Sequence, residues 1–265
     1  MNNNNIIKQY LHFDSIAAKY IFDTNNTSGN TQNAYKAIFP LTTTFRKIKR
    51  VWLKSVEITT AFPNIRTGST NTFKFILNNI TYTVSLTEAN YTTITSFLTV
   101  LSAACNSSIT GSGITMTFNL NSTNSNRLQI NFTGTISSFS IIDSNLSKYI
   151  LGFRSTDTLT SNIFTASSSN YSLNIDNYIN MYMPTFNNYN ANQNGSWSTF
   201  KLPLNSINNQ IYYYQDASSF EQSIDINDNN LVLSSLTVFV LDRFGNNLNP
   251  NNIDWSFTLA INYEL

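Results

Sequence analysis

Hydrophobic and polar residues alternate along this chain in many short runs. The clearest two lie at its C-terminal end, on either side of a Gly/Asn/Pro-rich turn over residues 243–252. The alternating apolar positions are Leu236, Val238 and Val240, followed by Trp255, Phe257, Leu259 and Ile261. Because successive side chains of a strand point to opposite faces of a sheet, this pattern predicts two strands with one face in a core.

The same pattern predicts about ten further strands. Their ranges are 34–43, 45–60, 73–77, 80–86, 114–120, 128–132, 136–142, 172–183, 197–204 and 210–214. The phase of the apolar residues shifts within 45–60, which predicts a β-bulge or two buried faces. Asn78-Asn79 is typical of a two-residue hairpin turn. The segment 144–153, SNLSKYILGF, indicates a helical turn or a tight corner.

One helix is predicted between the strands. Apolar residues recur at three- and four-residue spacing at Tyr91, Ile94, Phe97, Leu98, Leu101 and Ala104. Asn90 is the expected N-cap. A dozen strands and one helix predict an all-β sandwich or barrel.

The order of the elements predicts how the chain is divided. Residues 67–145 form a strand-strand-helix-strand-strand block, which we interpret as an insertion subdomain. Residues 34–66 and 146–265 would then build the sandwich around it. Residues 1–33 are rich in Asn and turn residues, and we expect an N-terminal arm or tail in which 19–22 could be a short strand.

Composition changes this picture in one respect. Of the 265 residues, 41% are hydrophobic and 11% are charged, and the net charge is +1. Asn, Ser and Thr therefore build the polar surface. Their abundance reflects either a β-rich, loop-rich fold or, for Asn, a coding bias in an A/T-rich genome. A weakly charged surface suits proteins that pack side by side. The N-terminus does not resemble a secretory leader, so we do not expect a secreted protein.

Candidate catalytic chemistry is sparse. His12 is the only histidine, and Cys105, the only cysteine, falls at the C-terminal end of the predicted helix, where the helix dipole disfavours a thiolate. One Cys and one His cannot supply the usual zinc ligand sets. We therefore expect no enzyme, and no catalytic, cofactor-binding or metal-binding residues.

One cluster of basic residues stands out. Five of the fifteen Lys and Arg residues fall within nine positions: Arg46, Lys47, Lys49, Arg50 and Lys54. They are interpreted either as a solvated strand edge or as a contact surface for an acidic partner, protein or nucleic acid. At a strand edge, Lys also prevents unwanted pairing with a strand of another chain. Trp52 lies in the same run and is expected in the core.

Four segments, in order along the chain, resemble penton and minor capsid proteins of virophages, Polinton-type elements and related large DNA viruses. They are FPNIRTGSTNTFKF around Asn64-Ile65-Arg66, VSLTEANYTTITSFLTVL, YILGF at 149–153, and LDRFGNNLNPNNIDWSFTLAINYEL with its Asp242–Asn246 turn. Glu88-Ala89 departs from the pattern, because family members often show Gly before Asn-Tyr.

The resemblance implies a single jelly-roll antiparallel β-sandwich and a structural role in a virus particle. The function it implies first is a penton protein that forms homopentamers at the fivefold vertices of an icosahedral shell, beside a double jelly-roll major capsid protein. The alternative is a minor, cementing capsid protein. The chain would then be located in the virion, after synthesis in the host cytoplasm or a virus factory. Whether the basic cluster would face the genome, an inner membrane or the capsid stays open.

Two functions of other classes are also considered. A carbohydrate- or receptor-binding β-sandwich would use Trp197 and Tyr212-Tyr213-Tyr214 as stacking groups. Adjacent tyrosines on a strand point to opposite faces, however, so at most two of them could share one. A hydrolase on a β scaffold would need acidic residues whose pairing the sequence does not indicate.

Overall fold

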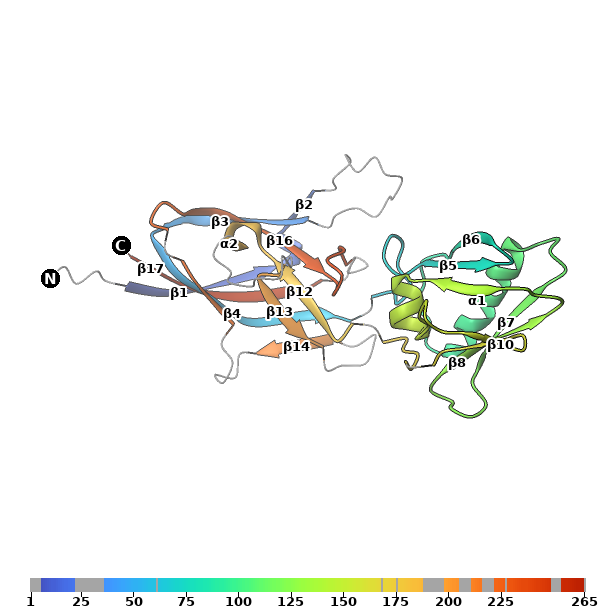
Figure 1. Cartoon of the computed structure of the whole chain (residues 1–265). Helices are drawn as coiled ribbons and strands as arrows, with labels where there is room; N and C mark the ends of the chain where they lie inside the picture. Colours follow the sequence, from blue (N-terminus) through green and yellow to red (C-terminus); the bar gives the residue numbers. More distant parts are fainter. Residues whose placement is uncertain are drawn as a thin grey trace. The chain divides into compact units, whose positions relative to one another are not determined.

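The computed structural model divides the chain into two compact units. One consists of Met1–Phe62 with Asp176–Leu265, and the other of Pro63–Ile175 (Figure 1). The structure describes residues 6–21, 36–60, 62–167, 169–174, 176–187, 198–204, 211–215, 222–226, 228–248 and 254–264.

The first unit is a sandwich of two antiparallel sheets. One sheet has the order β1-β17-β4-β14, with β15 also paired to β4, and the other has the order β13-β12-β16-β3-β2. The strands of the first sheet are β1 (Ile6–Asp14), β17 (Ser256–Glu264), β4 (Ile48–Thr59), β14 (Ile211–Gln215) and β15 (Ser223–Asp225). Those of the second are β13 (Phe200–Pro203), β12 (Tyr178–Tyr182), β16 (Val232–Leu241), β3 (Lys36–Arg46) and β2 (Lys19–Ile21). Two short helices, η1 (Ser15–Ala17) and α2 (Pro184–Asn187), lie beside the strands.

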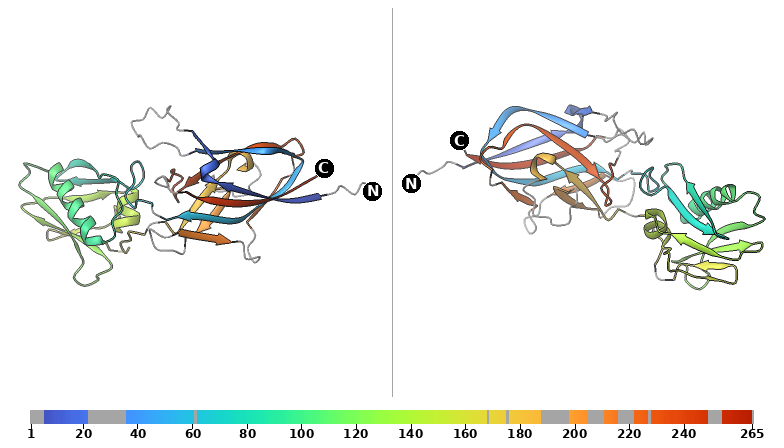
Figure 2. Two further views of the ribbon diagram at one scale, coloured as in Figure 1. Left: turned by 180° about the vertical axis from the view of Figure 1, so that it is seen from behind. Right: turned by 45° about the horizontal axis from the view of Figure 1, so that its top comes forward.

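The pairing follows the wrapping of a jelly roll. β1 pairs with β17 and β3 pairs with β16, so early strands of the chain lie beside late ones. β4 also pairs with β14 and β15, and β12 pairs with β13, so that with β2 beside β3 each sheet has five strands. Figure 2 shows β1, in blue, beside β17, in red. The all-β sandwich expected from the alternating pattern is therefore present.

Aromatic side chains from both sheets fill the sandwich. Phe13 of β1 stacks on Phe257 of β17 with ring centroids 4.6 Å apart, and Phe39 of β3 meets Phe257 edge-on at 5.5 Å. Trp255 lies in the same cluster, 5.6 Å from Phe257. Such ring pairs add to the free energy gained by burying the apolar surface.

β4 contains the irregularity that its sequence indicated. Its register against β17 shifts twice, once at Lys54 and once at Lys49. Each shift adds one residue and restores the phase, because a bulged strand places two residues opposite one. The core-facing residues of β4 are consequently Ile48, Val51, Leu53, Val56 and Ile58.

The N-terminal segment corrects the sequence-based expectation of an arm or tail. Residues 6–14 form β1, in which all nine residues pair with β17, and Phe13 is 4% exposed. The alternation in this strand is masked because its outward positions include Ile6 and Tyr10, while the polar Gln9 occupies an inward position. The short strand expected near 19–22 is β2.

The second unit holds two smaller sheets and the long helix. One sheet has the order β6-β5-β9 and the other the order β10-β11-β8-β7. The strands are β5 (Thr72–Leu77), β6 (Ile80–Ser85), β7 (Thr115–Leu120), β8 (Leu128–Thr133), β9 (Phe139–Ile142), β10 (Leu159–Thr160) and β11 (Ile163–Thr165). The helices are α1 (Ile94–Ser108) and the π-helix η2 (Leu146–Leu151).

This unit is longer than the block 67–145. Residues 146–175 belong to it and not to the sandwich, because β11 pairs with β8 and η2 buries Leu146, Ile150 and Leu151. The Asn78-Asn79 turn joins β5 to β6 with φ values of 50° and 67°, as a tight hairpin requires. The N-cap of α1 is Thr93 and not Asn90, since the Thr93 hydroxyl accepts from the Ser96 N–H at 3.3 Å. Among the described residues, no helix combines the length and apolarity needed to cross a bilayer.

Candidate interaction surface

The predicted basic cluster does not lie on one strand. Arg46 ends β3, and Lys47 adopts φ 50° where the chain passes from one sheet to the other. Lys49, Arg50 and Lys54 lie on β4 in the opposite sheet. The expectation of a continuous strand over residues 45–60 is therefore wrong at its beginning, because the turn between the layers comes at Lys47.

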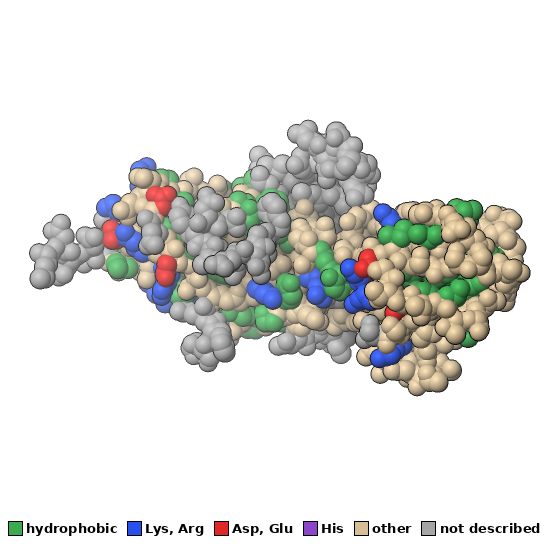
Figure 3. Space-filling model, viewed as in Figure 1, with side chains coloured by type: hydrophobic (Ala, Val, Ile, Leu, Met, Phe, Trp, Pro, Cys, Tyr) green, Lys and Arg blue, Asp and Glu red, His purple; other side chains and the backbone are tan. Residues whose placement is uncertain are grey.

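Lys49 and Arg50 form ion pairs with nearby acids. The Lys49 ammonium lies 3.3 Å from a Glu264 carboxylate oxygen, and the Arg50 guanidinium binds both oxygens of Asp225. The hydrogen bond from Arg50 is the main reason why the pKa of Asp225 is held below its usual value. Figure 3 shows basic and acidic side chains close together at the end of the sandwich unit where β1 begins. This end thus carries charges of both signs.

Trp52 lies on the outer face of the sheet, close to cationic side chains of β1 and β4. Its neighbours Val51 and Leu53 face the core, so the indole points away from it. The Lys8 ammonium from β1 lies 4.8 Å from the indole centroid, the Lys54 ammonium 5.8 Å and the Arg50 guanidinium carbon 5.9 Å. These distances allow cation–π attraction. Trp52 is buried as expected, at 5% exposure, but on the outer face of the sheet and not in the cluster between the two sheets.

An exposed tyrosine extends this surface across three strands. Tyr10 pairs with Ala260 of β17, and Ala260 pairs with Trp52. Tyr10 is 59% exposed, and Lys8 lies 5.5 Å from its ring. We call Lys8, Tyr10, Arg50, Trp52 and Lys54 the Trp52 surface. Sequence reasoning missed Lys8 and Tyr10 because they join β4 only through the pairing of β1 with β17.

Other candidate residues are accounted for by the fold. Cys105 is buried on α1, and burial raises the pKa of its thiol to about 12. His12 Nδ1 lies 3.1 Å from the Thr258 hydroxyl on the outer face of the sheet. Among the described residues, no group of three or more His, Cys, Asp or Glu is placed to hold a metal ion.

The tyrosine run of β14 does not form one platform. Tyr212 lies in the sandwich core at 8% exposure, while Tyr213 is 61% exposed. The alternation expected from the sequence is confirmed for this pair. Trp197, the other stacking candidate, lies outside the described residues.

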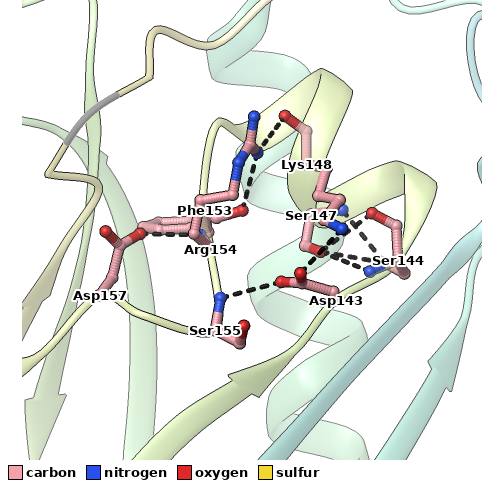
Figure 4. Close-up of polar contacts among 8 residues, drawn as sticks. All are labelled: Asp143, Ser144, Ser147, Lys148, Phe153, Arg154, Ser155 and Asp157. Carbon is pink, nitrogen blue, oxygen red and sulfur yellow. Dashed lines mark hydrogen bonds and ion pairs between the residues drawn. The ribbon is translucent and has the colours of Figure 1, made fainter.

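A second polar cluster lies at the corner after β9 in the second unit (Figure 4). Asp143 lies 2.8 Å from the Lys148 ammonium and accepts from the Ser155 N–H at 2.8 Å. The hydrogen bond from Lys148 lowers the pKa of Asp143. Asp157 accepts from the Arg154 N–H at 2.8 Å, and the Arg154 guanidinium donates to the Lys148 carbonyl at 2.6 Å. Both acids therefore hold backbone in place, and the cluster supports the corner expected over 144–153.

Comparison with known proteins gives matches among solved structures alone. No family model matches the chain, and no curated protein matches its sequence. The chain is similar to the mavirus penton protein, at 12% identity and a TM-score of 0.47, with 97% of this chain and 99% of that chain covered. It is also similar to a chain in the cryo-electron microscopy structure of the Sputnik virophage, at 12% identity and a TM-score of 0.38, with 96% and 98% covered.

Proposed function

We propose that this chain is a structural protein of an icosahedral virus particle, and that it forms the homopentameric penton at the fivefold vertices. The observation that carries the proposal is the jelly-roll strand order of the first unit, in which β1 pairs with β17 and β3 with β16. A fold alone does not fix a function. The strand order is joined here by the sequence resemblance to penton and minor capsid proteins.

Residues of the resembling segments hold tight turns in both units. Asp242 is fully buried, and its carboxylate accepts from the Phe244 and Asn246 N–H groups at 2.8 and 2.9 Å. Gly152, in the YILGF segment, ends η2 with φ 76°. The Asn64 side chain accepts from the Tyr91 N–H at 2.9 Å. These segments thus carry structural roles consistent with a rigid building block.

The proposed assembly is a closed ring. Identical copies that meet head to tail form a heterologous interface. Such an interface closes into a ring of five copies when the rotation between neighbours is one fifth of a turn. In the particle the ring would lie beside a double jelly-roll major capsid protein. A minor, cementing capsid protein remains the alternative assignment within the same class.

Light scattering on the purified full-length chain tests the proposal. We expect one species of about five times the 29.9 kDa of the chain, with no intermediate as the protein concentration rises. A stable oligomer of another size would favour the minor capsid assignment. A chain that stays monomeric at every concentration, and also fails to join a double jelly-roll shell protein on mixing, would overturn the proposal.

A further inference from the structure

Trp52 is almost fully buried, and the side chains of three cationic residues lie close to its ring. It lies on the outer face of its sheet, and the strand beside it contributes the small Ala260 at the paired position. Of the cations around its ring, Lys8 comes nearest, and Lys8 itself is exposed on β1. A lysine stem covers apolar surface while its ammonium stays in water, and it can swing aside at little cost.

Two groups of this surface lack a partner in the described part of the chain. The indole Nε1 of Trp52 is buried and has no hydrogen-bond acceptor. Lys8 contacts the rings of Trp52 and Tyr10 but forms no ion pair with a described residue. Both groups are donors, and the buried one, Trp52 Nε1, costs free energy while it has no acceptor. One carboxylate placed over the indole edge would satisfy both.

We infer that the Trp52 surface docks an acidic segment of a partner protein, whose Glu or Asp carboxylate pairs with Lys8 and accepts from Trp52 Nε1. The exposed ring of Tyr10 supplies apolar contact beside this anchor. Aromatic residues flanked by cations are typical of the residues that carry binding energy at protein interfaces.

The charges on this face favour a polypeptide over a nucleic acid. Asp225, whose side chain is 63% exposed, and the exposed Glu57 lie on the same outer face as Trp52. A nucleic acid presents a regular series of phosphates, and these carboxylates would repel it. A polypeptide can instead place a single carboxylate over Lys8 and keep its neighbouring residues uncharged.

Fluorescence anisotropy with the full-length chain tests the inference. The probe is a labelled peptide with one Glu among uncharged residues, compared with the same peptide carrying Gln in place of Glu and with an oligothymidylate. We expect the Glu peptide to bind, and added salt to weaken its binding. Lys8→Ala and Trp52→Phe should each weaken it about tenfold, the latter because phenylalanine keeps an aromatic ring but has no N–H donor.

Two further variants make the outcome decisive. Lys74→Ala removes an exposed lysine of β5 in the second unit, and its affinity should equal that of the unaltered chain. Lys8→Glu, at an exposed position of an edge strand, should abolish binding even if Trp52→Phe fails to fold. The inference is overturned if the Glu peptide does not bind, if the Gln peptide binds equally well, or if the oligothymidylate binds more tightly. It is also overturned if Lys8→Ala and Lys74→Ala change the affinity for the Glu peptide equally. Light scattering on the same samples reports ring formation separately, so a pentamer without peptide binding would contradict this inference alone.

Discussion

Replacing Gly152 with alanine should weaken the second unit and leave the sandwich intact. Gly152 ends η2 in the left-handed region with φ 76°. A Cβ atom there would lie 2.7 Å from the Ser169 carbonyl oxygen and 2.8 Å from that of Asn170. Both are backbone atoms, so they cannot move away as the end of a flexible side chain would.

The size of the effect follows from two contributions. Holding alanine in the left-handed region costs about 1 kcal/mol, and displacing packed backbone costs about 2 kcal/mol more. Gly111 offers a matched control, because it has φ 86° but no atom within 4 Å of an added Cβ. Gly111→Ala should therefore cost only the first contribution, about 1 kcal/mol.

The chain provides a separate probe for each unit. Cys105 is fully buried in the second unit, so a thiol reagent reaches it only when that unit opens. All three tryptophans, Trp52, Trp197 and Trp255, fall within the first unit, so their fluorescence reports the sandwich. At about 1.4 kcal/mol per tenfold, Gly152→Ala should label about 100-fold faster and Gly111→Ala about fivefold faster. The urea midpoint followed by tryptophan fluorescence should not change.

Two results would refute this reasoning. Equal labelling rates for the Gly152 and Gly111 variants would show that the close approach to the neighbouring carbonyls does not matter. A lower urea midpoint by tryptophan fluorescence in the Gly152 variant would show that the two units do not unfold separately.

Two further predictions concern acidic residues. Asp242→Ala should lower the free energy of unfolding of the sandwich by about 3 kcal/mol, because two N–H groups of its turn lose a buried acceptor. Asp225→Ala removes an exposed ion pair and should lower it by less than about 1 kcal/mol. Equal shifts of the urea midpoints of the two variants would contradict the structural role of Asp242. The hydrogen bond from Lys148 lowers the pKa of Asp143 in the folded state. The Asp143 carboxylate therefore contributes fully to stability above its unfolded-state pKa of about 4, and this contribution is lost as pH falls through the lower folded-state pKa. Asp143→Asn should therefore make stability fall less on acidification, as measured by urea midpoints from circular dichroism at several acidic pH values, and an unchanged pH dependence would count against it.

Local signals in the sequence predicted the individual elements well. The shifted phase of apolar residues in β4 indicated a bulge, and the register shows two. Asn78-Asn79 indicated the turn between β5 and β6. These features are encoded by neighbouring residues, because side-chain alternation and turn conformation depend on only a few positions.

The limits of the inserted unit were harder to predict from sequence. Residues 146–175 have short, weakly patterned strands, and β11 joins its sheet by pairing with β8, more than thirty residues earlier. The N-cap of α1 is Thr93, three residues after the expected Asn90. Both residue types suit an N-cap, and only the backbone geometry selects Thr93.

The sequence by itself determined that this chain builds sheets, where most strands lie, and that its basic residues gather near Trp52. The tertiary structure alone decided that residues 6–14 form a strand of the sandwich, because the partner of β1 is β17, at the other end of the chain. It also decided the composition of the Trp52 surface. Lys8 and Tyr10 reach that surface through a pairing between distant segments, and no local pattern records such a pairing.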